Sequence, residues 1–536
     1  MSQGQRGRGG PIFILGEDAQ RTQGRDAQNS NISAGKAVAE SVRTTLGPKG
    51  MDKMLVDDTG EVVITNDGVT ILDEMDIEHP AAQMLVEVAQ SQENEVGDGT
   101  TSASVLAGQL LAEAEDLLEQ DVHPTTVVEG YAAARDVALE AVEDLVLEDE
   151  LSEDVLRAVA RSSMTGKGTG DVDAETLATL VVDAIEAVTD EHGDVHREDV
   201  LVHTQKGASS SATDLVEGVL VDAEPLRSDM PREVEDATVA VLSIAIENRE
   251  ADVDASYEVD SVDQLNAAIE AEENELRGYV DALAEAGVDV VFTKEEIDER
   301  IAGTLADAGI LAFDDIDDLG DEDSMKAVAR ATGATPIGTL SEVDPDDLGV
   351  AERISVKTFG KSGAEDTLTF VEGGADTQTV TLFVRGGTDH VTDELERATG
   401  DALDVVSTTL RAGGVVPGAG ASEVYVANRV RDEAAGIPGR KQLAAEAFAD
   451  ALDAIPRTLA ANTGMDPIDA LVDLRAASTE NAGRAGIIIS GETGEIADPV
   501  EHGVLDPAAV KTEALENATE AATMITRIDD VIEAGD

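Results

Sequence analysis

The sequence predicts a multi-domain α+β protein that is mostly helical toward both ends and α/β in the middle. Its 536 residues exceed the roughly 250–300 at which one hydrophobic core stops growing, so at least two domains are expected. Apolar residues recur at helical spacing up to about residue 190, and they do so again beyond about residue 390. Between residues 237 and 332, short apolar runs alternate with helical stretches, which is typical of a layered α/β unit.

Hydrophobic periodicity also predicts the individual elements, and Gly and Pro mark where each pattern stops. The strand patterns in the middle of the chain are short apolar runs, as expected for buried strands. The expected helices cover 31–45, 81–96, a stretch from 100, 261–286, 295–308, 322–332 and 391–410, and the expected strands cover 61–72 (two, around a turn), 237–245, 288–293, 310–313 and 379–385.

The chain is a strong polyanion, because 113 Asp and Glu against 37 Lys and Arg give a formal charge of −76. Such a charge repels nucleic acids and anionic membrane surfaces, whose binding depends on Lys and Arg. It also opposes compaction, but at molar ionic strength the Debye length is about 3 Å and the repulsion is largely screened. We therefore expect a protein adapted to a salt-saturated cytoplasm; an acidic surface for a basic partner is the alternative.

Composition excludes further classes of protein. The chain has no Cys, which removes disulfides, thiolate zinc sites and cysteine nucleophiles. His192 and His196 stand four apart, but Gly193 between them indicates a turn, so no metal site is expected there. No apolar run reaches the ~18 residues of a membrane span, and residues 12–15 are too few for a signal peptide. We expect a soluble, cytoplasmic protein.

The segment Gly97-Asp98-Gly99-Thr100-Thr101 is the first candidate site. Two glycines allow a sharp bend that brings backbone N–H groups close to a ligand. The helix that follows offers free N–H groups and a positive dipole end to a phosphate, and the carboxylate can hold Mg²⁺. Taken alone, however, the segment is more often a Gly-rich turn with Thr100 or Thr101 as the helix cap.

Four other segments carry weaker signals, each with an ordinary structural explanation. Leu46-Gly47-Pro48 allows backbone to approach phosphates, although such loops are more often helix ends. Asp67 can position water, but Asn-Asp-Gly is also common turn chemistry. The loop 413–420 permits a flat ring to pack on backbone, and Asp506-Pro507 has the form of a helix cap with Pro in the first turn. No G-x-x-x-x-G-K-S/T motif occurs, which excludes an ordinary P-loop ATPase.

Taken together, these segments closely resemble group II chaperonins, the thermosome/CCT family. The resemblance extends over about residues 11–532 with the motifs in one order, and chance agreement of so many is negligible. The motifs are Arg21-Thr-Gln-Gly-Arg-Asp-Ala-Gln, Thr44-Thr-Leu-Gly-Pro-Lys-Gly-Met-Asp-Lys-Met-Leu-Val, Thr65-Asn-Asp-Gly-Val-Thr-Ile-Leu, Val96-Gly-Asp-Gly-Thr-Thr-Ser, Val415-Val-Pro-Gly-Ala-Gly-Ala, Gly464-Met-Asp-Pro-Ile-Asp-Ala-Leu and Arg527-Ile-Asp-Asp-Val-Ile.

The resemblance implies a chaperonin fold in which the chain runs out through three domains and back. A mostly helical equatorial domain would bind ATP, and a small intermediate domain would connect it to an α/β apical domain. The apical domain would bind substrate and carry a helical protrusion that serves as a built-in lid. The implied ranges are 1–146 and 404–536 for the equatorial domain, 147–215 and 370–403 for the intermediate domain, 216–369 for the apical domain and about 246–275 for the protrusion.

The resemblance also implies a role for each residue that matches a family motif. The ligands would be ATP and Mg²⁺, with K⁺ as a further candidate ion, and Asp98 would be the ligand of Mg²⁺. The matching residues are Leu46, Gly47, Pro48, Asp98, Gly99, Thr100 and Thr101 for the phosphates and the metal, Asp67 and Asp401 for the attacking water, Lys167 for nucleotide sensing, Asp506 for the ribose, and Gly418 and Ala419 near the adenine.

Two of these residues carry alternatives. The family's Gly-Gly-Gly near the adenine reads Gly418-Ala419-Gly420 here, so the methyl group of Ala419 would crowd the base if its φ is positive. Asp401 lies in a predicted helix beside an apolar stripe that includes Ala398 and Ala402. Without the family match, Asp401 would therefore be expected on a solvated helix face.

The implied function is that of an ATP-hydrolysing chaperone that encapsulates non-native polypeptides. Identical or paralogous subunits would form two stacked rings, with eight subunits in each ring by analogy. One alternative is a ring that binds clients without hydrolysis, but the intact Asp67, Asp98 and Asp401 argue against it. A second alternative is an unrelated small-ligand α/β enzyme centred on 216–369, where no nucleophile–base pair or dinucleotide motif stands out.

Overall fold

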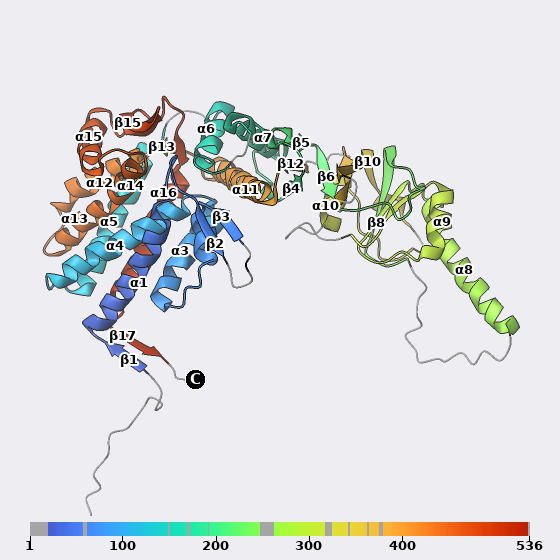
Figure 1. Ribbon diagram of the computed structural model, residues 1–536, viewed down its shortest axis with the longest axis horizontal. Helices are drawn as coiled ribbons and strands as arrows, with labels where there is room; N and C mark the ends of the chain where they lie inside the picture. Colours follow the sequence, from blue (N-terminus) through green and yellow to red (C-terminus); the bar gives the residue numbers. More distant parts are fainter. Residues whose placement is uncertain are drawn as a thin grey trace, which may run out of the picture. The chain divides into compact units, whose positions relative to one another are not determined.

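The described chain divides into two compact units, and we describe each by itself. The terminal unit comprises residues up to 167 and from 408 onward, and the central unit comprises 168–407 (Figure 1). Helix α11 (Asp389–Ala412) begins in the central unit and ends in the terminal unit. The structure, a computed structural model, describes residues 20–56, 60, 62–147, 151–168, 172–190, 192–246, 262–316, 324–340, 343–361, 364–374 and 379–533.

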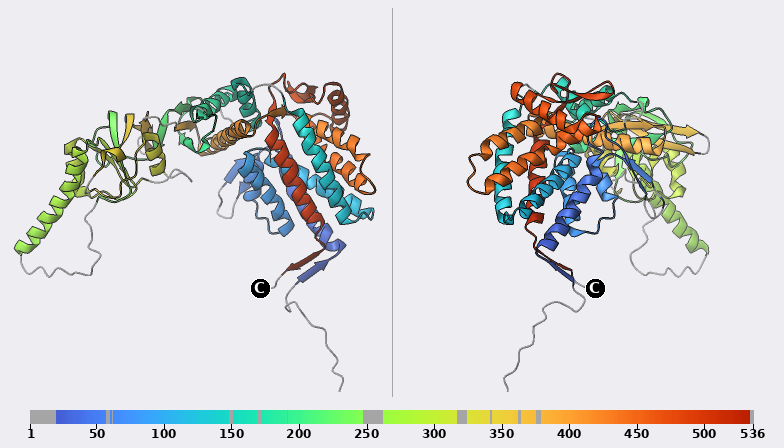
Figure 2. Two further views of the ribbon diagram at one scale, coloured as in Figure 1. Left: turned by 180° about the vertical axis from the view of Figure 1, so that it is seen from behind. Right: turned by 60° about the vertical axis from the view of Figure 1, so that its left-hand side comes forward.

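The terminal unit is a helical bundle built from both ends of the chain. Helix α1 packs against α3 and α4, and the C-terminal helix α16 packs against α3, α4 and α5, as Figure 2 shows for the blue and red helices. The helices are α1 (Arg25–Arg43), α2 (Gly68–Asp73), α3 (Pro80–Val96), α4 (Thr100–Glu119), α5 (Pro124–Leu145), α6 (Glu153–Ser163), α12 (Ala421–Ala434), α13 (Lys441–Leu452), α14 (Ala454–Asn462), α15 (Pro467–Glu480) and α16 (Ala508–Thr526).

Small and aliphatic side chains form the core of this bundle, as expected for a chain with seven Phe, four Tyr and no Trp. A Cβ added at Gly108 of α4 would lie 2.2 Å from the Cβ of Ala39 on α1, so the two helices approach closely. Tyr131 of α5 is fully buried and donates its hydroxyl hydrogen bond to a main-chain carbonyl of α4 at 2.8 Å. Its ring meets that of Phe448 edge to face, with centroids 5.8 Å apart.

The described part of this unit also contains two-stranded antiparallel sheets. Two of them join distant parts of the chain: β1 pairs with β17, and β13 pairs with β16 with Val416 opposite Asp506. The strands are β1 (Gln20–Gln23), β2 (Lys53–Val56), β3 (Val62–Thr65), β13 (Val415–Pro417), β14 (Gly486–Ser490), β15 (Thr493–Ala497), β16 (Leu505–Pro507) and β17 (Asp530–Glu533).

The expectation of two strands over 61–72 is wrong in its second half. Strand β3 ends at Thr65 and pairs with β2, whereas α2 begins at Gly68. Asp67 caps this helix, because its Oδ2 accepts hydrogen bonds from the backbone N–H of Thr70 at 2.8 Å and from the Thr70 hydroxyl at 2.7 Å. Helix capping by the Asp side chain therefore overrides the strand-like apolar pattern that follows.

The central unit contains two sheets. In the six-stranded sheet, of order β6-β11-β10-β7-β8-β9, the strands from β7 to β9 are parallel and the other pairs are antiparallel. The three-stranded sheet has the order β4-β12-β5. The elements are β4 (Val200–Lys206), β5 (Asp214–Val216), β6 (Gly218–Val221), β7 (Glu233–Leu242), β8 (Val290–Thr293), β9 (Leu311–Phe313), β10 (Gly349–Lys361), β11 (Ala364–Glu372), β12 (Val380–Gly386), α7 (Ala174–Ala187), α8 (Val262–Glu285), α9 (Glu299–Ala308) and α10 (Ser324–Thr332), with 3₁₀ turns at Arg197–Asp199, Ser210–Ala212 and Pro345–Asp347.

The predicted elements of the middle region are present as β7, β8, β9, α8, α9 and α10, and side chains of these helices pack into the core of the larger sheet. The long strands β10 and β11 were not predicted, because charged residues such as Glu352, Arg353 and Lys357 interrupt their apolar pattern. Of the expected protrusion, residues 247–261 lie outside the described residues, and α8 begins at Val262.

Candidate functional site

A cavity of about 430 Å³ lies in the terminal unit. This volume is within the usual range for a ligand site. Its walls come from both ends of the chain: the loop after α1, the start of α4, the turn after α6, the start of α12 and the start of α16. The predicted site residues that line it are Leu46, Gly47, Pro48, Asp67, Asp98, Gly99, Thr100, Thr101, Lys167, Ala419 and Asp506.

The turn between α3 and α4 forms the wall best suited to an anion. Gly97 and Gly99 both have left-handed backbone, with φ of 70° and 82°, which glycine adopts at little cost. A Cβ added at Gly99 would lie 2.8 Å from Val510 Cγ1, so space also requires glycine there. Within the described residues no side chain caps α4, and its first N–H groups, at Thr100 and Thr101, are therefore suited to a phosphate.

Asp98 lies between these two glycines, and its Oδ1 accepts a hydrogen bond from the Gly99 N–H at 2.7 Å. Burial raises the pKa of the Asp98 carboxyl above its usual range, and the charge of Asp506 adds to this, whereas Lys167, the Gly99 N–H and Lys511 oppose it. A bound cation would stabilise such a buried carboxylate.

The donor set around Asp98 fits Mg²⁺ bound together with phosphate. In the described part of the chain, no group of three or more His, Asp or Glu side chains could hold a metal by itself. Mg²⁺ in phosphate-transfer sites commonly takes one or two carboxylates and completes its shell with phosphate oxygens and water. Asp98 therefore suits a metal that arrives with a nucleotide.

The loop after α1 and the turn after α6 pack on each other. Gly47 has a φ of 85°, and a Cβ added at Gly166 would lie 2.7 Å from the Gly47 carbonyl oxygen. The Asn66 side chain holds the turn in place by donating a hydrogen bond to the Gly166 carbonyl at 2.5 Å. This packing brings Pro48 and Lys167 into the wall of one cavity.

Asp67 has an ordinary structural role and also lies in the cavity wall. It caps α2, and it also lines the cavity near the start of α4, where a Cβ added at the adjacent Gly68 would lie 2.6 Å from Thr101 Oγ1. The hydrogen bonds of the cap fix the carboxylate in position, and the role of Asp67 toward the attacking water remains a prediction.

Ala419 has a φ of 57°, which is the positive value on which the expected crowding depended. The methyl group lies toward Gly486, where an added Cβ would be only 2.9 Å from it, so the lack of a side chain at Gly486 leaves room for it. Gly418 does not line the cavity, but a Cβ added there would lie 3.1 Å from Asp506 Oδ1.

The expectation that Asp506 caps a helix is wrong. Asp506 belongs to β16, and Pro507 is the N-cap of α16. Its Oδ2 accepts a hydrogen bond from Lys511 Nζ at 2.6 Å, and the same ammonium donates to Glu423 Oε1 at 2.7 Å. Burial alone would lower the pKa of Lys511, but the two carboxylates raise it above its usual range. Lys511 and Glu423 both line the cavity, and the sequence did not single them out.

Asp401 lies on α11 in the central unit and is not part of this cavity wall. Asp401 is only 9% exposed. The alternative prediction, that Asp401 lies on a solvated face of its helix, is therefore wrong. Its role toward the attacking water remains a prediction.

A helix N-terminus, a glycine loop and a buried carboxylate around one cavity are characteristic of a nucleotide site without a P-loop. The model of the TCP-1/cpn60 chaperonin family matches residues 38–536. The chain is 64% identical to thermosome subunit 3 of Haloferax volcanii, over 98% of both chains. It is 51% identical to thermosome subunit 1 of the same organism, over 100% of this chain and 93% of the relative. Thermosome subunit alpha of Halobacterium salinarum is 49% identical, over 98% of this chain and 92% of the relative.

The chain therefore belongs to the TCP-1/cpn60 chaperonin family, and within it to the group II chaperonin subunits, which are ATP-dependent chaperones. This membership confirms the chaperonin fold class and implies nucleotide binding. Because Haloferax volcanii has at least two similar subunits, paralogous subunits are a feature of such complexes. Within the described residues, none of the helices has both the length and the apolarity to cross a bilayer.

Proposed function

We propose that the cavity of the terminal unit binds ATP with Mg²⁺, and that hydrolysis of this ATP drives the encapsulation of non-native polypeptides. The observation that carries the proposal is that groups suited to phosphate, metal and sugar line one cavity. N–H and hydroxyl donors at Thr100 and Thr101 lie near the buried Asp98, and Asp506 of β16 and Ala419 of the turn before α12 line the same cavity. The phosphates would lie at the start of α4 and the nucleoside beside Asp506.

The chemistry is transfer of the γ-phosphoryl group to water. The water oxygen forms a bond to the γ-phosphorus as the bond to the β–γ bridging oxygen breaks, and such reactions depend mainly on positioning and charge neutralisation. Asp98 would hold Mg²⁺, which neutralises phosphate charge when bound, and K⁺ is a further candidate ion. Asp67, fixed by its helix cap, orients the water, and Asp401 accepts its proton. Lys167 senses the nucleotide.

We also propose the three-domain organisation implied by the resemblance. The three-stranded sheet of the central unit supports a small intermediate domain, and the six-stranded sheet supports an apical domain that binds clients and carries a lid near 246–275. The proposed ranges are 1–146 and 404–536 (equatorial), 147–215 and 370–403 (intermediate) and 216–369 (apical).

Exposed apolar side chains support contacts between subunits. Met51, Met54 and Val56, in and just before β2, are each at least 61% exposed, and Ile532 of β17 is 52% exposed. Apolar groups on short, open strand edges are typical of surfaces that pair with another chain. We propose two stacked rings of identical or paralogous subunits, eight in each ring, in the cytoplasm.

Phosphate release measured alongside gel filtration tests this function. In molar KCl we expect ATP turnover in a particle near a megadalton, and dialysis into dilute buffer should dissociate it, because only a short Debye length screens −76 charges per subunit. Rings that bind unfolded protein without releasing phosphate would indicate the non-hydrolysing alternative. Active rings that persist in dilute buffer would contradict the proposed salt dependence.

A further inference from the structure

Three charged side chains meet in one wall of the cavity. Lys511 Nζ bridges Asp506 Oδ2 at 2.6 Å and Glu423 Oε1 at 2.7 Å. Their side chains are 15%, 22% and 7% exposed, respectively. One ammonium between two carboxylates leaves a net charge of −1 in a largely buried place. We refer to these three residues as the carboxylate–lysine triad.

The triad contains a carboxylate oxygen that accepts no hydrogen bond from the described residues. Oε2 of Glu423 is buried and has no hydrogen-bond partner among the described residues. An unpaired buried acceptor is costly, and a ligand that donates a hydrogen bond would remove that cost. The other oxygen of Asp506, Oδ1, lies close to Gly418, where a Cβ would be 3.1 Å away. A carboxylate pair of this kind suits a neutral ligand group that carries hydroxyl donors.

The charge of the triad argues against the other obvious role of Lys511, a direct contact with phosphate. Its ammonium already donates to two carboxylates, so the surroundings are anionic rather than cationic. A phosphate would be repelled by the net negative charge, whereas the start of α4, with free N–H groups, attracts it. The charge of the triad therefore favours a neutral part of the ligand beside it, such as the ribose, over a phosphate.

We propose that Lys511 is a positioning residue that holds the carboxylates of Asp506 and Glu423 as paired acceptors for the two ribose hydroxyls of the nucleotide. This inference rests on the proposed function, because it takes the cavity to bind ATP with its ribose at Asp506. Without the ammonium, the two carboxylates repel each other; they move apart or one takes up a proton. Either change removes one acceptor.

The test compares ATP with 2′-deoxy-ATP and 3′-deoxy-ATP, with dissociation constants measured by calorimetry on the assembled particle in molar KCl and Mg²⁺. For the parent protein we expect ATP to bind about tenfold or more tightly than either analogue, the usual effect of a hydrogen bond to a charged group. In Lys511→Met, which keeps an unbranched side chain only one atom shorter and removes the charge, this preference should fall to about threefold or less.

Lys36→Met is the matched control. Lys36 pairs with Glu115 at 2.7 Å in the same unit, and neither residue lines the cavity. The control variant loses the same charge and should keep the full preference for ATP. If Lys511 were only structural, both ATP and the analogues would bind more weakly by one factor, and the ratio would not change.

The outcomes separate this inference from the proposed function. A parent protein that binds ATP and the deoxy analogues equally would contradict the ribose role of Asp506 itself. A parent preference that survives in Lys511→Met would overturn the role of Lys511. If that variant fails to assemble, Glu423→Met decides, because it keeps the length of the side chain and removes both carboxylate oxygens. A preference reduced several-fold supports the triad, and an unchanged preference overturns it.

Discussion

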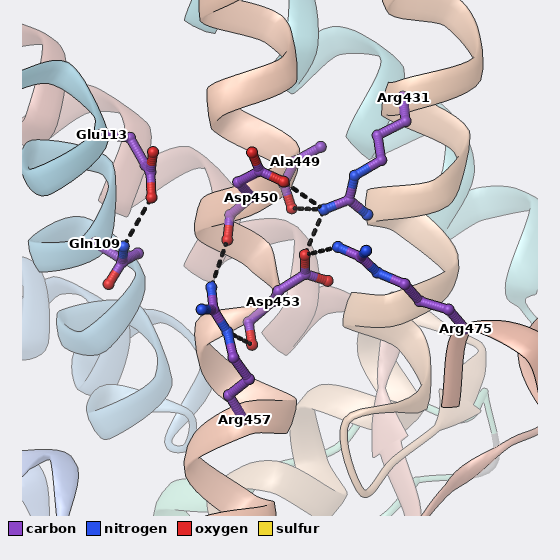
Figure 3. A network of polar contacts seen from close by, with 8 residues as sticks. All are labelled: Gln109, Glu113, Arg431, Ala449, Asp450, Asp453, Arg457 and Arg475. Atoms are coloured by element: carbon purple, nitrogen blue, oxygen red, sulfur yellow. Dashed lines mark hydrogen bonds and ion pairs between the residues drawn. The ribbon is translucent and has the colours of Figure 1, made fainter. Parts of the chain in front are cut away.

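Two buried carboxylates of the terminal unit, Asp453 and Asp98, are neutralised in opposite ways. Asp453 lies between α13 and α14, its side chain is 2% exposed, and it accepts hydrogen bonds from both Arg431 and Arg475 (Figure 3). Arg431 also pairs with Asp450 at 2.8 Å. The protein itself therefore supplies the cations around Asp453, from helices α12 and α15.

Asp98 is not held by arginines in this way. Its carboxylate accepts a hydrogen bond from the Gly99 N–H, and the charges of Lys167 and Lys511 only partly oppose the effect of burial. Its pKa is raised by burial. A carboxylate that the protein neutralises holds helices together, whereas one that it leaves short of positive charge is prepared for a cation brought by the ligand.

We expect the largest effect for a third carboxylate, that of Asp401. Its substitution tests whether an acidic residue that does not line the cavity takes part in the hydrolysis of bound ATP. Asp401→Ala should reduce the ATP turnover by about 10²–10⁴, the usual contribution of a positioned general base, because the group acts mainly in the transition state. ATP affinity should stay within a few fold of the parent value. Phosphate release and calorimetry in molar KCl measure the two quantities.

Rings of Asp401→Ala should still assemble and bind unfolded protein. Turnover at the parent rate would show that the water-activating role belongs to another residue.

Asp453→Asn tests the structural side of the comparison. It leaves two partly exposed arginines without their shared carboxylate, so the free energy of unfolding should fall by about 2–3 kcal/mol. Urea unfolding in molar KCl measures this loss. Asp450→Asn is the matched control, because this partner of Arg431 is 54% exposed, and it should cost no more than about 1 kcal/mol. Equal losses in both variants would remove the distinction between them.

Asp98→Asn should behave in the opposite way. Removing a carboxylate that burial disfavours should raise the thermal stability of the nucleotide-free protein, while Mg²⁺-dependent ATP affinity falls at least about tenfold. Calorimetry with Mg²⁺ and with a chelator separates the metal-dependent part. A variant that is less stable and still binds Mg²⁺–ATP normally would contradict our account of Asp98.

The raised pKa of Asp98 also predicts a pH dependence. The carboxyl takes up its proton at a higher pH than an ordinary Asp, so the Mg²⁺-dependent part of ATP binding should decline as pH falls through that raised pKa. The stability of the nucleotide-free protein should change in the opposite direction. It should rise as pH falls through the raised pKa of Asp98, because protonation removes the cost of the buried charge. The decline in Mg²⁺-dependent affinity should be absent in Asp98→Asn.

The smallest expected effect concerns the strained backbone of Ala419, which lines the cavity. Ala419 has a left-handed φ of 57°, which costs a non-glycine residue roughly 1–2 kcal/mol. Ala419→Gly relieves that cost but adds flexibility to the unfolded chain, so a net gain of about 1 kcal/mol or less is expected. Ala421→Gly, the same change in the first turn of α12, should instead destabilise the protein. Thermal unfolding distinguishes the two signs.

Local sequence patterns predicted some of the residues that line the cavity and missed others. Gly97 and Gly99 mark a turn before a helix, and the structure has that turn in the cavity wall. Glu423 and Lys511 carry no such signal, since they are 88 residues apart and meet only through tertiary structure, in which β13 pairs with β16. Asp506 was wrongly expected to cap a helix, because the sequence does not show that its segment pairs with β13 as a strand.

The fold shows a similar division. Strongly periodic helices such as α3 were predicted to within a residue at each end. The alternation of charged and apolar residues hid β10 and the adjacent β11, which pair with each other, and the other neighbour of β10, β7, comes from a distant segment of the chain. Long-range strand pairing is set by contacts that a single sequence does not display.

The two ends of the chain meet in the terminal unit, which has a consequence for synthesis on the ribosome. The cavity wall contains both Thr45 and Leu515, and β1 pairs with β17. At ~5–20 residues per second, the last part of the wall is made tens of seconds after the first. The nascent chain therefore completes the whole central unit before its nucleotide site can close. Binding stabilises only the state that has the site, so a nucleotide bound there would stabilise finished chains but not truncated ones that lack α16.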